Sequence, residues 1–160
     1  MSNGNAVQAA VVPMTREHIS EIARLEGLCF SQPWSQQGLA AELTNSTARF
    51  LVALWQEKIA GYAGMHGICG EGYIANIAVF PEYRKKGIGR TLVRALLETA
   101  RREAYDFLSL EVRPSNLPAV ELYRSEGFQT VGMRRGFYDH PKEDGCIMTY
   151  FFKDEGENKR

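Results

Sequence analysis

The spacing of hydrophobic residues changes several times along this chain of 160 residues, and each change marks an element. Short apolar runs, rich in β-branched and aromatic residues and bounded by glycine or polar residues, predict strands. Longer stretches with apolar residues three or four positions apart predict helices. The predicted strands are 7–13, 48–55, 59–66, 71–79, 107–112, 129–134 and 146–152, and the predicted helices are 15–30, 35–43, 87–104 and 116–126.

The order of these elements predicts how the strands pair. The connection from strand 71–79 through a helix to strand 107–112 favours a parallel pair, whereas the short hairpins favour antiparallel pairs. We therefore predict an α/β fold, a mixed sheet of seven strands flanked by about four helices, in a single domain over residues 1–160. Residues 1–6 and the charged residues 154–160 are expected to be disordered tails.

Amino-acid composition limits the classes of binding partner and the cellular locations that are expected for this protein. Lysine and arginine balance aspartate and glutamate at 19 each, so no general affinity for nucleic acid is expected. The three cysteines, Cys29, Cys69 and Cys146, lack the spacing of a metal site, and reduced thiols indicate a cytoplasmic protein with no metal. No signal peptide or membrane span is read. Oligomeric state is left open.

The segment Arg84-Lys-Lys-Gly-Ile-Gly-Arg90 lies between a strand and a helix and is unusually basic. The start of a helix has free N–H groups and already carries positive potential, so acidic residues are favoured there. Basic residues and two glycines instead suit a polyanion such as a pyrophosphate, which can approach the bare backbone closely. The alternative is a basic surface turn. The P-loop pattern is absent.

Arg84-x-x-Gly87-x-Gly89, after Asn76-Ile-Ala-Val79 and Pro81, resembles the acetyl-coenzyme A motif of the GNAT N-acyltransferase superfamily. The resemblance implies the GNAT fold and acetyl-CoA as cosubstrate. It also implies a bulge in the preceding strand, with an oxyanion donor among the N–H groups of residues 77–79. The residues implied to bind the coenzyme are Ile77, Ala78, Val79, Arg84, Lys85, Lys86, Gly87, Ile88, Gly89, Arg90, Asn116 and Tyr123.

A second motif, Cys29-Phe-x-x-Pro-Trp-Ser35 followed by Glu42-Leu43, resembles the bacterial ribosomal-protein-alanine N-acetyltransferases within that superfamily. Phe30 and Trp34 either plug the edge of the domain or form a wall of the acceptor pocket. The later segment 136–145 resembles the substrate-side loop of these enzymes. It differs at Gly145-Cys146, where these enzymes often have an alanine followed by an aliphatic residue. We assign acceptor binding to Phe30, Trp34, Asn76 and Tyr138. Asp139, Glu143 and Asp144 either attract a basic acceptor residue or are simply solvated.

Two residues are candidates for proton transfer. Glu111 lies near the end of a predicted strand and is either paired with Arg113 or a general base, the role that the resemblance of Leu110-Glu-Val-Arg113 implies. Tyr123 is either a core aromatic or the acid that protonates the coenzyme thiolate, as the resemblance implies, and a phenol has a proton to donate at pH 7. Asn116 can cap the helix that it precedes as well as bind the coenzyme.

The acceptor can be weighed by its basicity. An α-amino group, with a pKa of about 7.7–8.0, is appreciably neutral near pH 7.5, whereas a lysine amine with a pKa of about 10.4 is almost wholly protonated. One carboxylate base therefore suits the N-terminal amine of a protein, and the resemblance implies the N-terminal alanine of a small-subunit ribosomal protein. The alternatives are a lysine or small-molecule amine as acceptor, or an acyl-CoA sensor without turnover.

Overall fold

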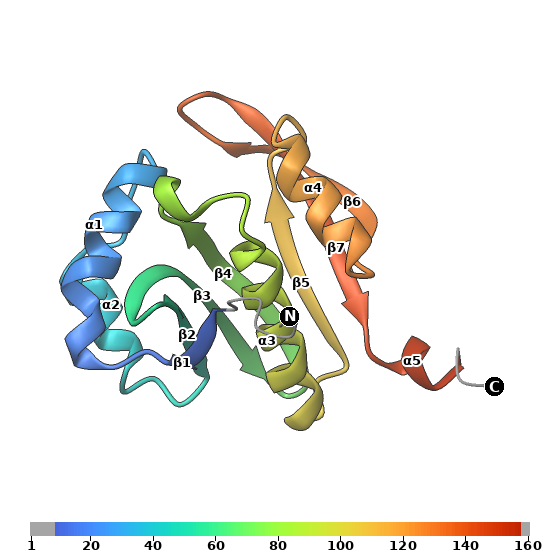
Figure 1. Cartoon of the computed structure of the whole chain (residues 1–160). Helices are drawn as coiled ribbons and strands as arrows, with labels where there is room; N and C mark the ends of the chain where they lie inside the picture. The colour runs from blue at the N-terminus through green and yellow to red at the C-terminus, as the bar shows by residue number, and fades with distance from the viewer. Residues whose placement is uncertain (1–8, 158–160) are drawn as a thin grey trace, which may run out of the picture.

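The computed structural model describes residues 9–157, and its centre is one sheet of seven strands (Figure 1). The strand order is β1-β2-β3-β4-β5-β7-β6, and every neighbouring pair is antiparallel except β4 and β5. The predicted mixed sheet is thus confirmed. The strands are β1 (Ala10–Pro13), β2 (Ala48–Trp55), β3 (Lys58–Ile68), β4 (Glu71–Val79), β5 (Phe107–Val112), β6 (Gln129–Tyr138) and β7 (Glu143–Phe151).

Helices cover both faces of this sheet, because side chains alternate along its central strands. Val52 and Tyr62 pack in a cluster with α1 and α2, whereas Ala53 and Ala63 pack in another with α3 and α4. The helices are α1 (Ile19–Cys29), α2 (Gln36–Glu42), α3 (Ile88–Arg102), α4 (Leu117–Ser125) and α5 (Lys153–Glu157), with 3-10 turns at Arg16–His18 and Pro81–Tyr83. Within residues 9–157 no helix has the length and apolar character needed to cross a bilayer.

The parallel pair opens the sheet. β4 and β5 are paired only from Glu71–Tyr73 to Phe107–Ser109, and beyond these residues the two strands diverge toward their carboxyl ends (Figure 1). β4 also carries a bulge, because Gly64 pairs with Asn76 while Met65 pairs with Ile74, which leaves Ala75 without a partner. The bulge that the family resemblance implied is therefore present, at the point where the sheet opens.

The last two strands are longer than the hydrophobic pattern predicted. Pairing of β6 with β7 continues through an irregular stretch after Arg134 as far as Tyr138 and Glu143, so the expected loop 136–145 shrinks to residues 139–142. The extension lacks a regular alternation of buried and exposed residues, because Arg135, Gly136 and Phe137 are all exposed, and strand periodicity therefore did not reveal it. It brings Tyr138 beside the end of β5. The first predicted strand begins at Ala10, and residues 7 and 8 lie outside the described part.

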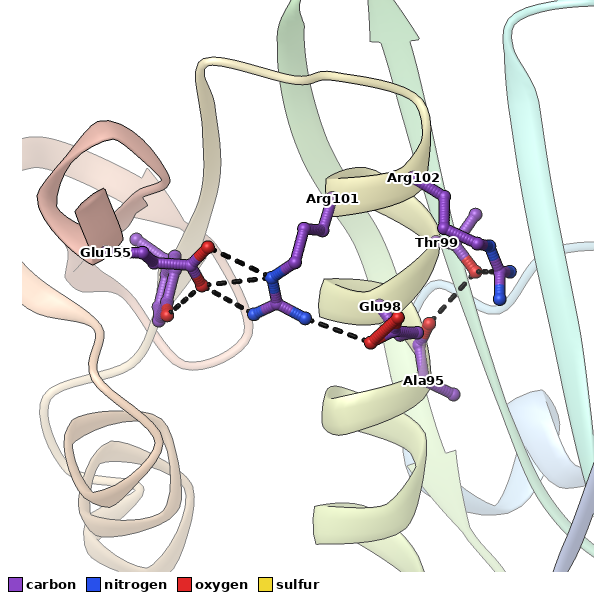
Figure 2. Close-up of polar contacts among 7 residues, drawn as sticks. Ala95, Glu98, Thr99, Arg101, Arg102 and Glu155 are labelled. Carbon is purple, nitrogen blue, oxygen red and sulfur yellow. Dashed lines mark hydrogen bonds and ion pairs between the residues drawn. The ribbon is translucent and has the colours of Figure 1, made fainter. Parts of the chain in front are cut away.

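The charged tail differs from the expectation of disorder. Lys153–Glu157 forms the short helix α5, and Glu155 accepts hydrogen bonds from Arg101 of α3 and from the hydroxyl of Tyr150. Figure 2 shows the Arg101 guanidinium between Glu155 and Glu98, which is one turn earlier on α3. These contacts fix residues 153–155 against the far end of α3. The expected tail residues 1–6 and 158–160 lie outside the described residues.

Candidate active site

The basic segment before α3 forms a turn whose backbone donors are free. Gly87 is the N-cap residue with φ of +79°, a conformation that a residue with a side chain adopts only with strain. The first turn of α3 contains no acidic residue. Within the described chain, no partner is recorded for the backbone N–H groups from Lys85 to Arg90. Free N–H groups at the start of a helix fit a pyrophosphate, which is the group that the resemblance implied.

The side chains of this segment are mostly engaged within the protein. Arg84 donates through Nε to the carbonyl of Val79 at 3.2 Å, and the Lys86 ammonium lies 5.5 Å from the centre of the Trp55 ring. Arg90 pairs with Glu126, and Ile88 is a core residue that is 2% exposed. At Ile88 and Arg90, therefore, only the backbone and not the side chain is available to an anion.

A cleft of about 870 Å³ lies where β4 and β5 diverge, and it collects most of the other predicted site residues. Ala78 and Val79 do not line it, because Ala78 is buried in the core beneath α1 and the Val79 carbonyl accepts from Arg84. The basic segment 84–90 does not line it either. The predicted residues in its wall are Phe30, Trp34, Asn76, Ile77, Glu111, Asn116, Tyr123 and Tyr138.

Glu111 projects from β5 into this cleft and is paired with a residue that the sequence did not suggest. Its Oε1 lies 3.1 Å from Nη2 of Arg134, a guanidinium on β6 that also lines the cleft. The expected alternative, a pair between Glu111 and Arg113, is absent from the described contacts. No partner is recorded for Oε2 of Glu111 in the described chain, so this oxygen can accept a proton from a bound amine.

Tyr123 on α4 is both a packed aromatic and a wall of the cleft. Its ring meets the Phe128 ring edge to face, with centroids 5.6 Å apart, and the residue is 9% exposed. No hydrogen-bond partner is recorded for its hydroxyl within the described residues. Burial, with a smaller contribution from Tyr138, raises the pKa of Tyr123 above its usual value. The phenol therefore keeps its proton at physiological pH.

Tyr138 is held at the edge of the cleft by Arg113. The Arg113 guanidinium lies 4.3 Å from the centre of the Tyr138 ring and donates to the carbonyls of Asp139 and Pro141. Burial and the nearby Glu111 carboxylate raise the pKa of Tyr138 to about 12. Arg113, expected as a partner of Glu111, instead fixes the turn between β6 and β7.

The acidic residues of this turn already have partners. Glu143 accepts from both the backbone N–H and the hydroxyl of Ser115, which lowers the pKa of the Glu143 carboxyl. Asp144 accepts from the N–H of Gly136 at 2.7 Å. Glu143 and Asp144 therefore stabilise the turn, and of the three acidic residues considered as attractants for a basic acceptor only Asp139 lines the cleft.

Helix capping and one buried acid complete the site. Asn116 caps α4 by accepting from the N–H of Ala119 at 3.3 Å, and the predicted cap is confirmed.

Sequence reasoning missed Glu26, whose carboxylate contacts Trp34 and Asn76 behind the cleft. The signal was available, because an acidic residue stands seven positions after Ile19 on the apolar stripe of α1.

Comparisons with known proteins agree with this arrangement. Residues 19–128 match the model of the acetyltransferase (GNAT) family. The chain is 37% identical over 120 residues to the ribosomal protein bS18-alanine N-acetyltransferase of Escherichia coli, covering 72% of this chain and 79% of that protein. It is also 37% identical over 141 residues to the N-alpha-acetyltransferase RimI of Mycobacterium tuberculosis, covering 84% and 87% of the two chains.

The fold agrees as well. The crystal structure of the ribosomal-protein-S18-alanine N-acetyltransferase from Escherichia coli superposes with a TM-score of 0.83 at 27% identity, covering 90% of this chain and 94% of that one. The family model spans well over half of the chain. The chain is therefore a member of the GNAT family of acetyl-CoA-dependent N-acetyltransferases.

Proposed function

We propose that this enzyme acetylates the N-terminal α-amine of a protein, and that its acceptor is the N-terminal alanine of a small-subunit ribosomal protein. The name of the E. coli relative supports this acceptor, and the name of the M. tuberculosis relative supports an α-amine as the group acetylated. The cytoplasmic location expected from the cysteines remains a prediction.

Two parts of the site bind the cosubstrate, the segment before α3 and the bulged strand β4. The N–H groups from Lys85 to Arg90 hold the coenzyme phosphates, and the bulged edge of β4 around Ile77 lies along the rest of the cosubstrate. Acetyl-CoA supplies the acetyl group as an activated thioester. Asn116 contributes a further polar contact at the start of α4, alongside its capping role.

Proton transfer falls to two side chains in the cleft. Glu111 accepts a proton from the acceptor amine at Oε2, directly or through water, so that the amine attacks without a covalent acyl-enzyme. Tyr123 holds a proton at its hydroxyl and donates it to the leaving sulfur. An α-amine with a pKa of about 8 needs only a modest base to lose its proton. A partly exposed carboxylate is therefore better suited to an α-amine acceptor than to a lysine acceptor.

One observation carries this proposal: the connection between α1 and α2, three strands and α4 bring six side chains to a single cleft, namely Phe30, Trp34, Asn76, Glu111, Tyr123 and Tyr138. An acceptor bound among the first three can therefore meet the base and the acid together. The test offers an alanine-terminated peptide, the same peptide with a blocked N-terminus and one lysine, and a polyamine together with acetyl-CoA.

Mass spectrometry then identifies which of the three acceptors carries an acetyl group. Acetylation of the free N-terminus alone supports the proposal. Acetylation of the polyamine or of the lysine peptide without the free N-terminus contradicts the acceptor, and binding of acetyl-CoA with no product contradicts catalysis.

A further inference from the structure

Glu26 is a fully buried carboxylate that meets three hydrogen-bond donors. Its Oε1 accepts from the backbone N–H of Trp34 at 2.9 Å, and its Oε2 accepts from Nδ2 of Asn76 at 2.8 Å and from the hydroxyl of Tyr62. The side chain is 0% exposed. None of the ion pairs found in residues 9–157 includes it.

This arrangement is costly for stability alone. Burial raises the pKa of Glu26, whereas the three donors favour the charged form. A buried acid of this kind is often replaceable by an apolar residue without loss of stability. All three partners donate and none accepts, so the carboxylate is satisfied as an anion. A network of three hydrogen bonds to one carboxylate can instead serve to hold its partners in a fixed geometry.

The geometry concerns the acceptor side of the cleft. Glu26 belongs to α1, and its partners belong to the turn before α2, to β3 and to β4. Trp34 and Asn76 line the cleft, whereas Tyr62 is buried in the core and does not. Glu26 therefore joins two separate cleft-lining residues behind the wall.

The network also fixes the orientation of the Asn76 amide. A carboxylate can only accept, so the NH₂ group of Asn76 must face Glu26. The other amide atom, Oδ1, has no recorded partner among the described residues. Asn76 thus presents an acceptor atom, not a donor, to a molecule in the cleft.

We propose that Glu26 is a positioning residue for the acceptor. It holds the main chain of Trp34 and orients Asn76 so that Oδ1 binds an N–H group at the amino end of the acceptor peptide. This inference rests on the proposed function. It adds a residue that lies outside the cleft and acts through two residues within it.

Three variants test this role. Glu26→Gln keeps the volume but allows the Asn76 amide to turn, and we expect the KM for an alanine-terminated peptide to rise about tenfold, the effect of one misplaced hydrogen bond. The Kd for acetyl-CoA stays within about twofold because the basic segment is untouched. Asn76→Ala gives a similar rise in KM. Adding Glu26→Gln to it gives a further rise much smaller than tenfold, because the contribution through the Asn76 amide is already lost and only the hold on Trp34 remains.

Tyr62→Phe is the matched control. It removes the one donor to Glu26 that does not line the cleft, so thermal stability falls while the peptide KM stays within about twofold. A peptide KM unchanged in Glu26→Gln overturns the inference. An equal rise in KM for Tyr62→Phe also overturns it, because the effect would then be a general loss of structure.

A spectroscopic measurement separates this inference from the acceptor proposal. The chain has two tryptophans, so Trp55→Phe leaves the fluorescence of Trp34 alone. In that background, Glu26→Gln is expected to increase quenching of Trp34 by acrylamide, and Tyr62→Phe is not. Unchanged quenching in Glu26→Gln contradicts the network even if no peptide is acetylated. Failure of the unmodified protein to acetylate any peptide contradicts the proposed function instead.

Discussion

Nη2 of Arg134 lies 3.1 Å from Oε1 of Glu111, so the carboxylate expected to act as the base already has a cation beside it. The Arg134 side chain is 58% exposed, and an ion pair of this kind contributes at most about 1 kcal/mol. An ammonium group that enters the cleft can therefore compete with Arg134 for the carboxylate. The pair therefore favours the empty site slightly over the site with an acceptor bound.

Removal of this competitor gives the first prediction. In Arg134→Gln we expect the KM for the acceptor peptide to fall about two- to fivefold, corresponding to the lost ion pair of at most about 1 kcal/mol. Steady-state kinetics at saturating acetyl-CoA measure the change. The control is Arg135→Gln, an exposed neighbour for which no ion pair is recorded in the described chain. A rise in KM would mean that Arg134 contacts the acceptor itself.

The second prediction concerns the two proton-transfer residues. Glu111→Gln and Tyr123→Phe are each expected to reduce kcat by about 10²–10⁴-fold, the usual contribution of a positioned acid or base. The Kd for acetyl-CoA stays within about twofold, because Tyr123→Phe keeps the ring against Phe128. Single-turnover kinetics and calorimetry measure the two quantities.

Tyr105→Phe is the control for the loss of a phenol, since Tyr105 packs in the core and does not line the cleft. Its kcat should match that of the unmodified enzyme. Unchanged kcat in both Glu111→Gln and Tyr123→Phe would exclude these residues from proton transfer.

The order of elements and the identity of the basic segment could be predicted from sequence because each depends on local spacing. Strand 71–79 reads as a strand from its residues, and the change to a helical period after Gly87 is visible directly. The opening between β4 and β5 could not be predicted. It results from pairing that stops at Tyr73 and Ser109, and no local pattern specifies where a parallel pair ends.

Partners across the sheet were hidden for a similar reason. Arg134 reaches Glu111 because β7 lies between β5 and β6, and the register places Gly132 and Glu111 against the same residue, Ile147. A one-residue change in that register would turn Arg134 to the other face. Arg113 is only two positions from Glu111 in sequence and was therefore the expected partner. Its guanidinium instead lies over the ring of Tyr138.

The third prediction separates backbone strain from coenzyme binding. Gly87 and Gly136 both have positive φ, +79° and +65°, and an added Cβ meets nothing within 4 Å at either position. Alanine should therefore reduce the free energy of unfolding at each by about 1–2 kcal/mol, through conformational strain alone. Only Gly87→Ala should also weaken acetyl-CoA binding, because its turn carries the free N–H groups. Equal Kd values for the two variants would contradict the assignment of that turn to the coenzyme phosphates.

The fourth prediction concerns the pH dependence of stability. Glu126, 7% exposed at its side chain, accepts from Nε of Arg94 at 2.8 Å and pairs with Arg90. The hydrogen bond from Arg94, followed by the contacts with Arg90, lowers the pKa of the Glu126 carboxyl below its ordinary value of 4.5. A carboxyl with a lowered pKa in the folded state stabilises the protein above its unfolded pKa, and the contribution is lost as the pH falls through the folded value.

Glu126→Gln should therefore reduce the free energy of unfolding by roughly 1–2 kcal/mol at pH 7, and the difference from the unmodified protein should shrink below about pH 4.5. Urea unfolding at several pH values measures this difference. Glu121→Gln is the control, because its pair with Arg124 is exposed on the surface of α4 and should contribute little at any pH. A difference for Glu126→Gln that stayed constant down to pH 3 would mean that packing, and not the paired charge, is what Glu126 contributes between α3 and α4.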